Sequence, residues 1–423
     1  METHFMPWQA PKNLIMIDVH CYNDQHKALL TNKPYPTKAI NKLIKSPTSI
    51  HPADLFTYML VHRKGLGPAE YSSIQSLRDN IRSVVEYSQL LIDFNGGSVR
   101  AQQSVNAVPG DVTTRLGEAV GLCVLDNLHN LTLPDWTPIP ELRGRGKSKK
   151  TLDFITNTAS SGAQFIQVET KGAYVTDNNK KMGSISRHKK DILDKKTAQR
   201  PARKSNTLYY GAIGAFDKDT NRNAKCWLLD PPGDYVDRSP SAYRILARMT
   251  FIERWVRLIA PSSVLSAQLF ARFQELLTSD DIFKYNNQPL KPTNSKPHNN
   301  PFLSRDTYVE GEYTGGLSIW IGNGQLAFIG FEAELFNLAL NQNFDELSSF
   351  RREAKIESRT VNFSLPEYFI PKSPQYTGGT TRAKPIGAWN FKELGSTITF
   401  KLHGDLNYSQ CGLVTGILGT PYT

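Results

Sequence analysis

The feature that most constrains the fold is a series of helical and extended patterns in the middle of the chain. Apolar side chains recur there first at helical spacing, and then in β-rich runs that turn-forming residues separate. In chain order, we expect a helix over residues 112–129, strands over 152–156 and 164–175, a helix over 184–200, and strands over 207–216 and 226–229. This order is typical of an α/β unit, which we place at about 111–230.

The rest of the chain is expected to form additions around this unit. With 423 residues the chain exceeds one ordinary core, so two or three domains are expected. An Asn/Pro-rich segment, 286–301, marks a connector. We therefore divide the chain into an N-terminal mixed α/β region (1–110), a core with trailing helices (111–285), this connector and a β-rich C-terminal region (302–423).

Four further patterns lie outside the strands and helices of the α/β unit. Residues 131–150 hold closely spaced prolines and glycines and are expected to form a loop. Helical spacing continues over 241–277. Alternating apolar residues over 317–331, interrupted by an Asn-Gly pair, predict a β-hairpin, and 396–402 alternates as well.

The second β-rich run of the α/β unit carries an E-x-K sequence. Side chains alternate along a strand, so Glu169 and Lys171 point to one face, while Ile166 and Val168 face the other way and suit a core. Hydrolysis of a phosphodiester needs a metal that binds the phosphate and activates water, and carboxylates supply its ligands. A nearby ammonium can orient that water and offset charge in the transition state. Glu169 and Lys171 are therefore half of a candidate hydrolytic site.

The first β-rich run contributes Asp153 to the same candidate site. A hairpin between the two runs would bring this aspartate opposite Glu169. The literal Pro134-Asp135 sequence is a rival for this role. Asp135 lies in a proline-rich loop, however, whereas Asp153 lies on a strand directly before the hairpin, and we favour Asp153.

The predicted helix over 112–129 supplies a third acid. Glu118 shares its helix face with Gly121, Leu122 and Leu125, and a carboxylate on such an apolar stripe is costly unless something binds it. Gly117 and Gly121 would also let the helix approach the sheet closely.

Together these residues resemble the PD-(D/E)XK nuclease superfamily of restriction enzymes, resolvases and antiviral effectors. The resemblance covers about 111–230 and consists of a helical acid (Glu118), a strand aspartate (Asp153), and E-x-K-Gly on the partner strand (Glu169, Lys171). It implies a restriction-endonuclease-like core (helix, mixed sheet, helix) that cleaves DNA with Mg²⁺ or Mn²⁺. In such a core Asp153 and Glu169 would hold the metal. Lys171 would orient the attacking water, and Glu118 would support the site or bind a second metal.

A second E-x-K sequence, Glu353-Ala354-Lys355, is rejected as the catalytic one. It lies in a charged stretch that we expect to be helical, where side chains two residues apart do not share a face. Asp18, His20, Asp24 and His26 have the composition of a metal site, but their spacing matches no known site, so a satisfied loop cluster is expected.

Positive charge is concentrated around the candidate site. The chain has a net charge of +11, and residues 141–204 hold sixteen Lys and Arg against six Asp and Glu. Cations clustered near a phosphate site are what nucleic-acid binding through counterion release requires. The expected partner is double-stranded DNA, and the candidate contacts are Arg143, Arg145, Lys147, Lys189 and Lys190.

The remaining sequence features favour an intracellular, cytoplasmic protein. The four cysteines are far apart and form no CxxC pair, which argues against a structural zinc site and a disulfide framework. The N-terminal residues lack a signal-peptide pattern, and no apolar run approaches the length of a membrane span.

Three functions are compatible with this sequence. The first is a metal-dependent endonuclease in restriction-type cleavage or antiviral defence, a setting that the resemblance alone implies. The second is a non-catalytic nucleic-acid-binding protein on the same fold, and the third is an interaction or structural protein whose basic loops only solubilise it. In the first, the β-rich C-terminal region would recognise substrate, a partner or the second subunit of a homodimer.

Overall fold

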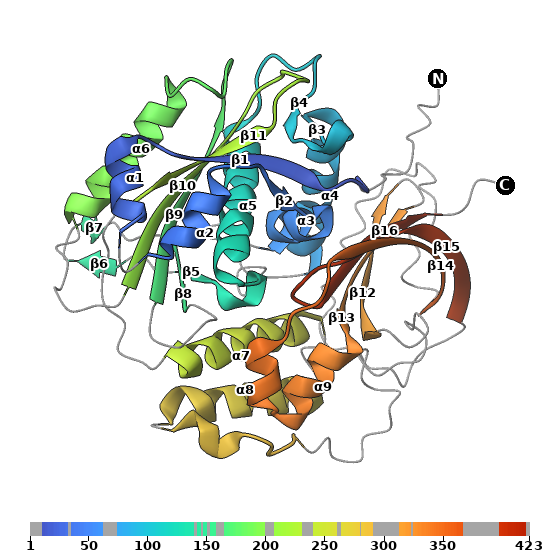
Figure 1. The fold of residues 1–423 in the computed structure, drawn as a ribbon. Coiled ribbons are helices and arrows are strands. Elements are labelled where there is room, and N and C mark those ends of the chain that lie inside the picture. Colours follow the sequence, from blue (N-terminus) through green and yellow to red (C-terminus); the bar gives the residue numbers. More distant parts are fainter. Residues whose placement is uncertain are drawn as a thin grey trace, which may run out of the picture.

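A computed structural model shows two large β-sheets with helices packed against them (Figure 1). The residues that it describes are 11–32, 35–61, 74–138, 142–144, 147–149, 153–157, 165–198, 207–230, 240–259, 264–279, 281–290, 313–322, 325–366 and 397–419.

The larger sheet is mixed and has the strand order β2-β1-β11-β10-β9-β8-β5. Its strands are β1 (Ile15–Cys21), β2 (Thr48–Ile50), β5 (Thr137–Pro138), β8 (Phe154–Asn157), β9 (Phe165–Tyr174), β10 (Thr207–Phe216) and β11 (Ala224–Leu229). Two neighbouring pairs, β9/β10 and β1/β11, are parallel, and the other pairs are antiparallel. The expected α/β class with a mixed sheet is therefore confirmed, and the sheet takes strands from both the 1–110 and the 111–285 regions.

Helix α5 (Gly110–His129) packs directly on one face of this sheet through glycines. A Cβ atom on Gly117 would lie 2.1 Å from the Cα of Gly172 in β9, and one on Gly214 in β10 would lie 2.9 Å from the Cα of Gly117. Gly121, one turn later, faces Thr170 and Ala212. Real Cβ atoms do not approach other atoms this closely, so backbone touches backbone here. Helix α6 (Ser184–Ala198) contacts β9 and β10 as well, and its Ile185 and Ile192 join a separate apolar cluster with Ala173 and Ile213.

The smaller sheet is antiparallel and has the order β12-β13-β16-β15-β14. Its strands are β12 (Tyr313–Gly322), β13 (Gln325–Glu332), β14 (Lys355–Pro366), β15 (Thr397–Tyr408) and β16 (Leu413–Gly419). Gly322 pairs with Gln325, so β12 and β13 form the hairpin predicted around the Asn-Gly pair.

The remaining helices surround and connect the two sheets. They are α1 (Asp24–Leu30), α2 (Thr37–Leu43), α3 (Pro52–Val61), α4 (Ile74–Leu90), α7 (Pro240–Ile259), α8 (Val264–Thr278), α9 (Ala333–Asn341) and α10 (Phe344–Ser349). Helix α3 contacts α5 as well as β15 and β16, and one apolar core includes residues of both sheets. No helix in the described ranges is long and apolar enough to cross a bilayer.

Two of the predicted segments differ from the structure. Residues 131–150 are not one loop, because β5, β6 (Leu142–Gly144) and β7 (Lys147–Lys149) lie within them, and β6 pairs with β7 as a small hairpin. The helical pattern over 241–277 divides into α7 and α8. Pro261 explains the interruption, since proline lacks a backbone N–H and disfavours helix for the residue before it.

A partly buried carboxylate joins α3 to the smaller sheet. Asp54 accepts a hydrogen bond from the backbone N–H of Gln410, in the turn between β15 and β16, at 2.7 Å. Burial raises the pKa of Asp54 to about 7, while this hydrogen bond and the charge of Arg351 act in the opposite direction. The carboxyl group is therefore largely protonated in the folded protein below neutral pH.

We predict that Asp54→Asn stabilises the protein increasingly as pH rises from 5 to 8. Between the ordinary aspartate pKa and about 7, the folded state holds a proton that the unfolded state has lost, so the unfolding free energy of the wild type falls with rising pH. Asparagine cannot ionise but can still accept the bond from Gln410. Thermal melting of both proteins at pH 5 and pH 8 measures the effect, and an advantage that does not grow with pH would contradict it.

We also predict that Gly117→Ala destabilises the fold by about 1–3 kcal/mol or more, because the new methyl group meets backbone atoms that cannot rotate away. Gly110→Ala is the matched control in the same helix, since no atom lies within 4 Å of the Cβ position at Gly110. Urea unfolding of the two variants provides the comparison. Equal midpoints would mean that the helix and the strand do not touch at Gly117.

Candidate active site

Strand β9 presents Glu169 and Lys171 on the face of the larger sheet opposite α5. Thr170 and Gly172, which alternate with them, are the residues that contact α5. Glu169 is fully buried, and the Lys171 ammonium forms an ion pair with its Oε1. The Lys171 side chain is 21% exposed, so Lys171 is the member of this pair that reaches solvent.

Asp153 lies beside this pair, immediately before β8. It was predicted within a strand, whereas β8 begins one residue later, at Phe154. Its backbone N–H still donates to the carbonyl of Val168 at 2.9 Å, so Asp153 continues the pairing of β8 with β9. Its Oδ2 accepts hydrogen bonds from the backbone N–H and the hydroxyl of Thr170, at 3.0 and 3.3 Å.

The structure thus brings three of the four predicted catalytic residues together. Oδ2 of Asp153 lies 4.0 Å from the ammonium nitrogen of Lys171, which also pairs with Glu169. Two buried carboxylates from neighbouring strands therefore share one cationic group. Asp153 is 1% exposed, so both acids are shielded from bulk water.

Glu118, the fourth predicted residue, lies on α5, which covers the opposite face of the sheet. It is 1% exposed and follows Gly117, whose Cβ position would lie 2.5 Å from the carbonyl oxygen of Lys171. The helix therefore crosses β9 at the E-x-K sequence. This crossing places the backbone of Glu118 next to the strand that carries Glu169 and Lys171.

His188 on α6 is a neighbour of the site that the sequence patterns did not identify. Its Nε2 donates to the carbonyl of Gly172 at 3.0 Å, so α6 holds the residue after Lys171 from the side opposite α5. Burial, and then the positive charge of Lys171, lower the pKa of His188. The helical spacing of Ile185, His188 and Ile192 could have revealed a polar group on an apolar stripe.

The donor set suits Mg²⁺ or Mn²⁺ bound in part by water. In the described part of the chain, no three His, Cys, Asp or Glu side chains are grouped so as to hold a metal ion by themselves. Asp153 and Glu169 offer two hard oxygen ligands, and Mg²⁺ commonly binds one or two carboxylates and takes its other ligands from water and phosphate. Both carboxylates converge on the Lys171 ammonium, so the two acids are arranged around a positive charge.

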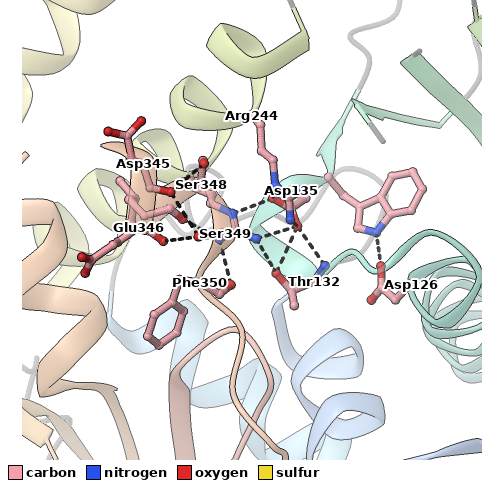
Figure 2. Close-up of polar contacts among 12 residues, drawn as sticks. Asp126, Thr132, Asp135, Arg244, Asp345, Glu346, Ser348, Ser349 and Phe350 are labelled. Carbon is pink, nitrogen blue, oxygen red and sulfur yellow. Dashed lines mark hydrogen bonds and ion pairs between the residues drawn. The ribbon is translucent and has the colours of Figure 1, made fainter. Parts of the chain in front are cut away.

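The rival Asp135 has a different environment (Figure 2). It is fully buried, and both Arg244 and Arg248 donate two hydrogen bonds to its carboxylate, at 2.6–3.0 Å. Thr132 adds its backbone N–H and its hydroxyl. Burial alone would raise the pKa of Asp135, but the two arginines outweigh it and lower the pKa to about 2. This carboxylate anchors α7, since Arg248 also donates to the carbonyl oxygens of Leu347 and Phe350.

The second E-x-K sequence is not helical, contrary to the prediction. Glu353 lies outside regular structure and Lys355 begins β14, in which residues two apart share a face. Lys355 accordingly forms an ion pair with Glu357 at 2.8 Å. Both side chains of the E-x-K sequence are exposed, unlike Glu169.

The Asp18–His26 group also differs from its prediction, because it lies on β1 and α1 and not in a loop. Its side chains have separate partners. Asp18 accepts from the side-chain amide of Asn223 at 3.0 Å, and Nδ1 of His26 accepts from the backbone N–H of Asp230 at 3.2 Å.

The predicted nucleic-acid contacts lie on two elements. Arg143 and Lys147 lie on the β6/β7 hairpin, and Arg145 lies outside the described residues. Lys189 and Lys190 lie on α6, where Lys190 is exposed.

No protein-family model, curated protein or solved structure matches this chain. The resemblance to the PD-(D/E)XK nucleases consequently rests on Glu118, Asp153, Glu169 and Lys171 and on the elements that carry them. Along the chain, α5 is followed by β8, β9, α6 and β10, with the short strands β5, β6 and β7 between α5 and β8.

We predict that Asp135→Asn lowers the unfolding free energy. Removing one partner of a buried ion pair typically costs about 3–5 kcal/mol, and here two arginines lose their counter-charge. Urea unfolding of the variant and the wild type measures the effect. A variant as stable as the wild type would contradict the anchoring role of Asp135.

Proposed function

We propose that this protein is a metal-dependent endonuclease that hydrolyses phosphodiester bonds of double-stranded DNA. The observation that carries the proposal is the convergence of the Asp153 and Glu169 carboxylates on the Lys171 ammonium, where β8 and β9 pair inside a mixed sheet. Two buried acids and a partly exposed lysine are the groups that metal-assisted hydrolysis requires.

Each residue has a distinct role in the proposed site. Asp153 and Glu169 hold Mg²⁺ or Mn²⁺, which when bound lowers the pKa of a water molecule and polarises the scissile phosphate. The backbone and hydroxyl of Thr170 orient the Asp153 carboxylate. Lys171, which reaches solvent, orients the attacking water and offsets the negative charge of the transition state. Glu118 supports the site from α5.

The fold and the chemistry of the chain support this assignment indirectly. We take α5, β8, β9, α6 and β10 to be a restriction-endonuclease-like core. The net charge of +11 suits a polyanionic substrate, and the four free cysteines suit the reducing cytoplasm, where restriction or antiviral defence would operate. The smaller sheet is our candidate for target recognition or for a homodimer contact.

A non-catalytic nucleic-acid-binding protein is the second candidate. The basic helix α6 favours it equally, because binding needs cations and does not need buried acids. Supercoiled plasmid DNA with Mg²⁺ or Mn²⁺ distinguishes the two functions. The nuclease nicks the plasmid and EDTA abolishes the nicking, whereas the binding protein only slows the migration of the intact plasmid in a gel.

We predict that Lys171→Ala loses cleavage by on the order of a hundredfold or more, as expected for a contact made in the transition state. Its affinity for DNA should change little, because other cations hold the duplex. Lys190→Ala should show the reverse, with weaker binding and a rate at saturating DNA close to that of the wild type.

The second E-x-K sequence provides a matched control for this experiment. Lys355→Ala removes a lysine from the same local sequence, and this lysine is exposed on β14. It should cleave at the wild-type rate. The proposed centre is wrong if Lys171→Ala cleaves like the wild type, and it is misplaced if only Lys355→Ala loses activity.

A further inference from the structure

Two aromatic rings beside α6 carry three ammonium groups. The rings of Tyr22 and Trp227 are 6.4 Å apart between centroids. Lys181 lies 5.4 Å from the first centroid and 5.0 Å from the second. Lys189 lies 4.7 Å from Tyr22, and Lys225 lies 5.4 Å from Trp227. We call these five residues the lysine–aromatic cluster.

The lysine–aromatic cluster lies on the same face of the larger sheet as Glu169 and Lys171. Tyr22 and Trp227 share an apolar cluster with Ala173, which alternates with Thr170 and Gly172 and so faces away from α5. Lys171 pairs with Ile213, and Ile213 pairs with Trp227, so two strand spacings separate the candidate site from the cluster. Two spacings are about 10 Å, which is roughly three base pairs of duplex.

Two of these ammonium groups have no ionic partner in the described part of the chain. Within the described residues, neither Lys181 nor Lys189 forms an ion pair, although both lie within 5.4 Å of the centre of one ring. Both lysines thus bring positive charge to the Tyr22 ring, and an anion bound there would neutralise it. Lys225 is different, because its ammonium bonds to Asn179 and feels the charges of Asp18 and Asp177.

A buried donor lies beside Lys181 and Lys225. The indole Nε1 of Trp227 has no hydrogen-bond partner in the part of the chain that the structure describes, and Trp227 is 4% exposed. Buried N–H groups without an acceptor are uncommon in native proteins. An acceptor oxygen that reaches the cluster would satisfy this N–H, and phosphate supplies such oxygens.

Neither ring is available to stack on a base. Tyr22 is 8% exposed and Trp227 is 4% exposed, with lysine ammonium groups over both. Stacking by bases requires open aromatic faces, whereas phosphate contacts require only the cations. The cluster therefore recognises charge and carries no information about base sequence.

We propose that the lysine–aromatic cluster binds backbone phosphates of the DNA duplex, a few base pairs from the bond that is cut. The inference rests on the proposed function, because it assigns the path of that substrate. Arg187 and Lys190 are exposed on α6, the helix that contacts β9 and β10, and add positive charge near the cluster and the site. Binding here positions the duplex and is independent of its sequence.

The test measures binding of a fluorescent 30-base-pair duplex by anisotropy, in EDTA so that no cleavage occurs, over a range of KCl concentrations. The full chain is compared with Lys181→Gln/Lys189→Gln. We expect weaker binding and a plot of log affinity against log salt that is shallower by about 1.8, at about 0.9 for each phosphate that is no longer neutralised. A second duplex of unrelated sequence should show the same change.

Two matched variants accompany the test. Lys181→Arg/Lys189→Arg keeps both charges and should retain the wild-type slope. Lys42→Gln/Lys45→Gln removes two lysines that are exposed on and after α2, a helix that contacts α5, and should also retain the wild-type slope.

Each outcome decides one of the two proposals. Parallel salt plots for the wild type and Lys181→Gln/Lys189→Gln overturn the phosphate site, even if the protein cleaves DNA. A change confined to one duplex overturns the sequence-independent contact. A shallower slope in a protein that never cleaves supports the phosphate site and overturns only the nuclease, and no binding by the wild type overturns both.

Discussion

The contact between α5 and β9 is the constraint on which the candidate site depends. Gly117 and Gly172 touch through their backbones, so this face of the sheet has no room for side chains where the helix crosses. Because side chains alternate along β9, closing one face to them assigns Glu169 and Lys171 to the other. The same contact brings the α5 backbone at Glu118 against the strand that carries them. A shift of α5 would therefore move Glu118 relative to Glu169 and Lys171.

The pKa values of carboxylates in this fold are shifted in opposite directions, and the groups that contact each carboxylate decide the direction. Asp135 has two arginines and remains ionised, with a pKa lowered to about 2. Burial dominates at Asp54 and Asp126, and each has its pKa raised to about 7. Asp126 receives hydrogen bonds from the neutral groups of Tyr58 and Trp136, which do not offset burial as an arginine does. The pair Asp153 and Glu169 resembles Asp135 in having a cation next to it.

The parts of the fold that follow from local pattern were predictable. Strand β9, helix α5 and the β12/β13 hairpin have strong periodicity, and the sharing of one face by Glu169 and Lys171 follows from strand geometry alone. The pairing of β1 with β11 could not be predicted, because nothing local specifies a partner about two hundred residues away. The contact of His188 with Gly172 and the Lys355–Glu357 pair were missed for the same reason, since both depend on which elements pack together or extend.

The position of β1 in the larger sheet has a consequence for how the chain is made. Asp18 bonds to Asn223 across 205 residues, and β1, which can pair early with β2, must wait for β11 before its other edge is paired. At roughly 5–20 residues per second, the ribosome needs on the order of 10–40 s to produce that partner. During this interval the apolar side chains of β1, Ile15, Ile17 and Val19, which are buried in the folded protein, lie on an incomplete sheet. A nascent chain of this kind is an expected client of chaperones that bind short apolar segments as they emerge.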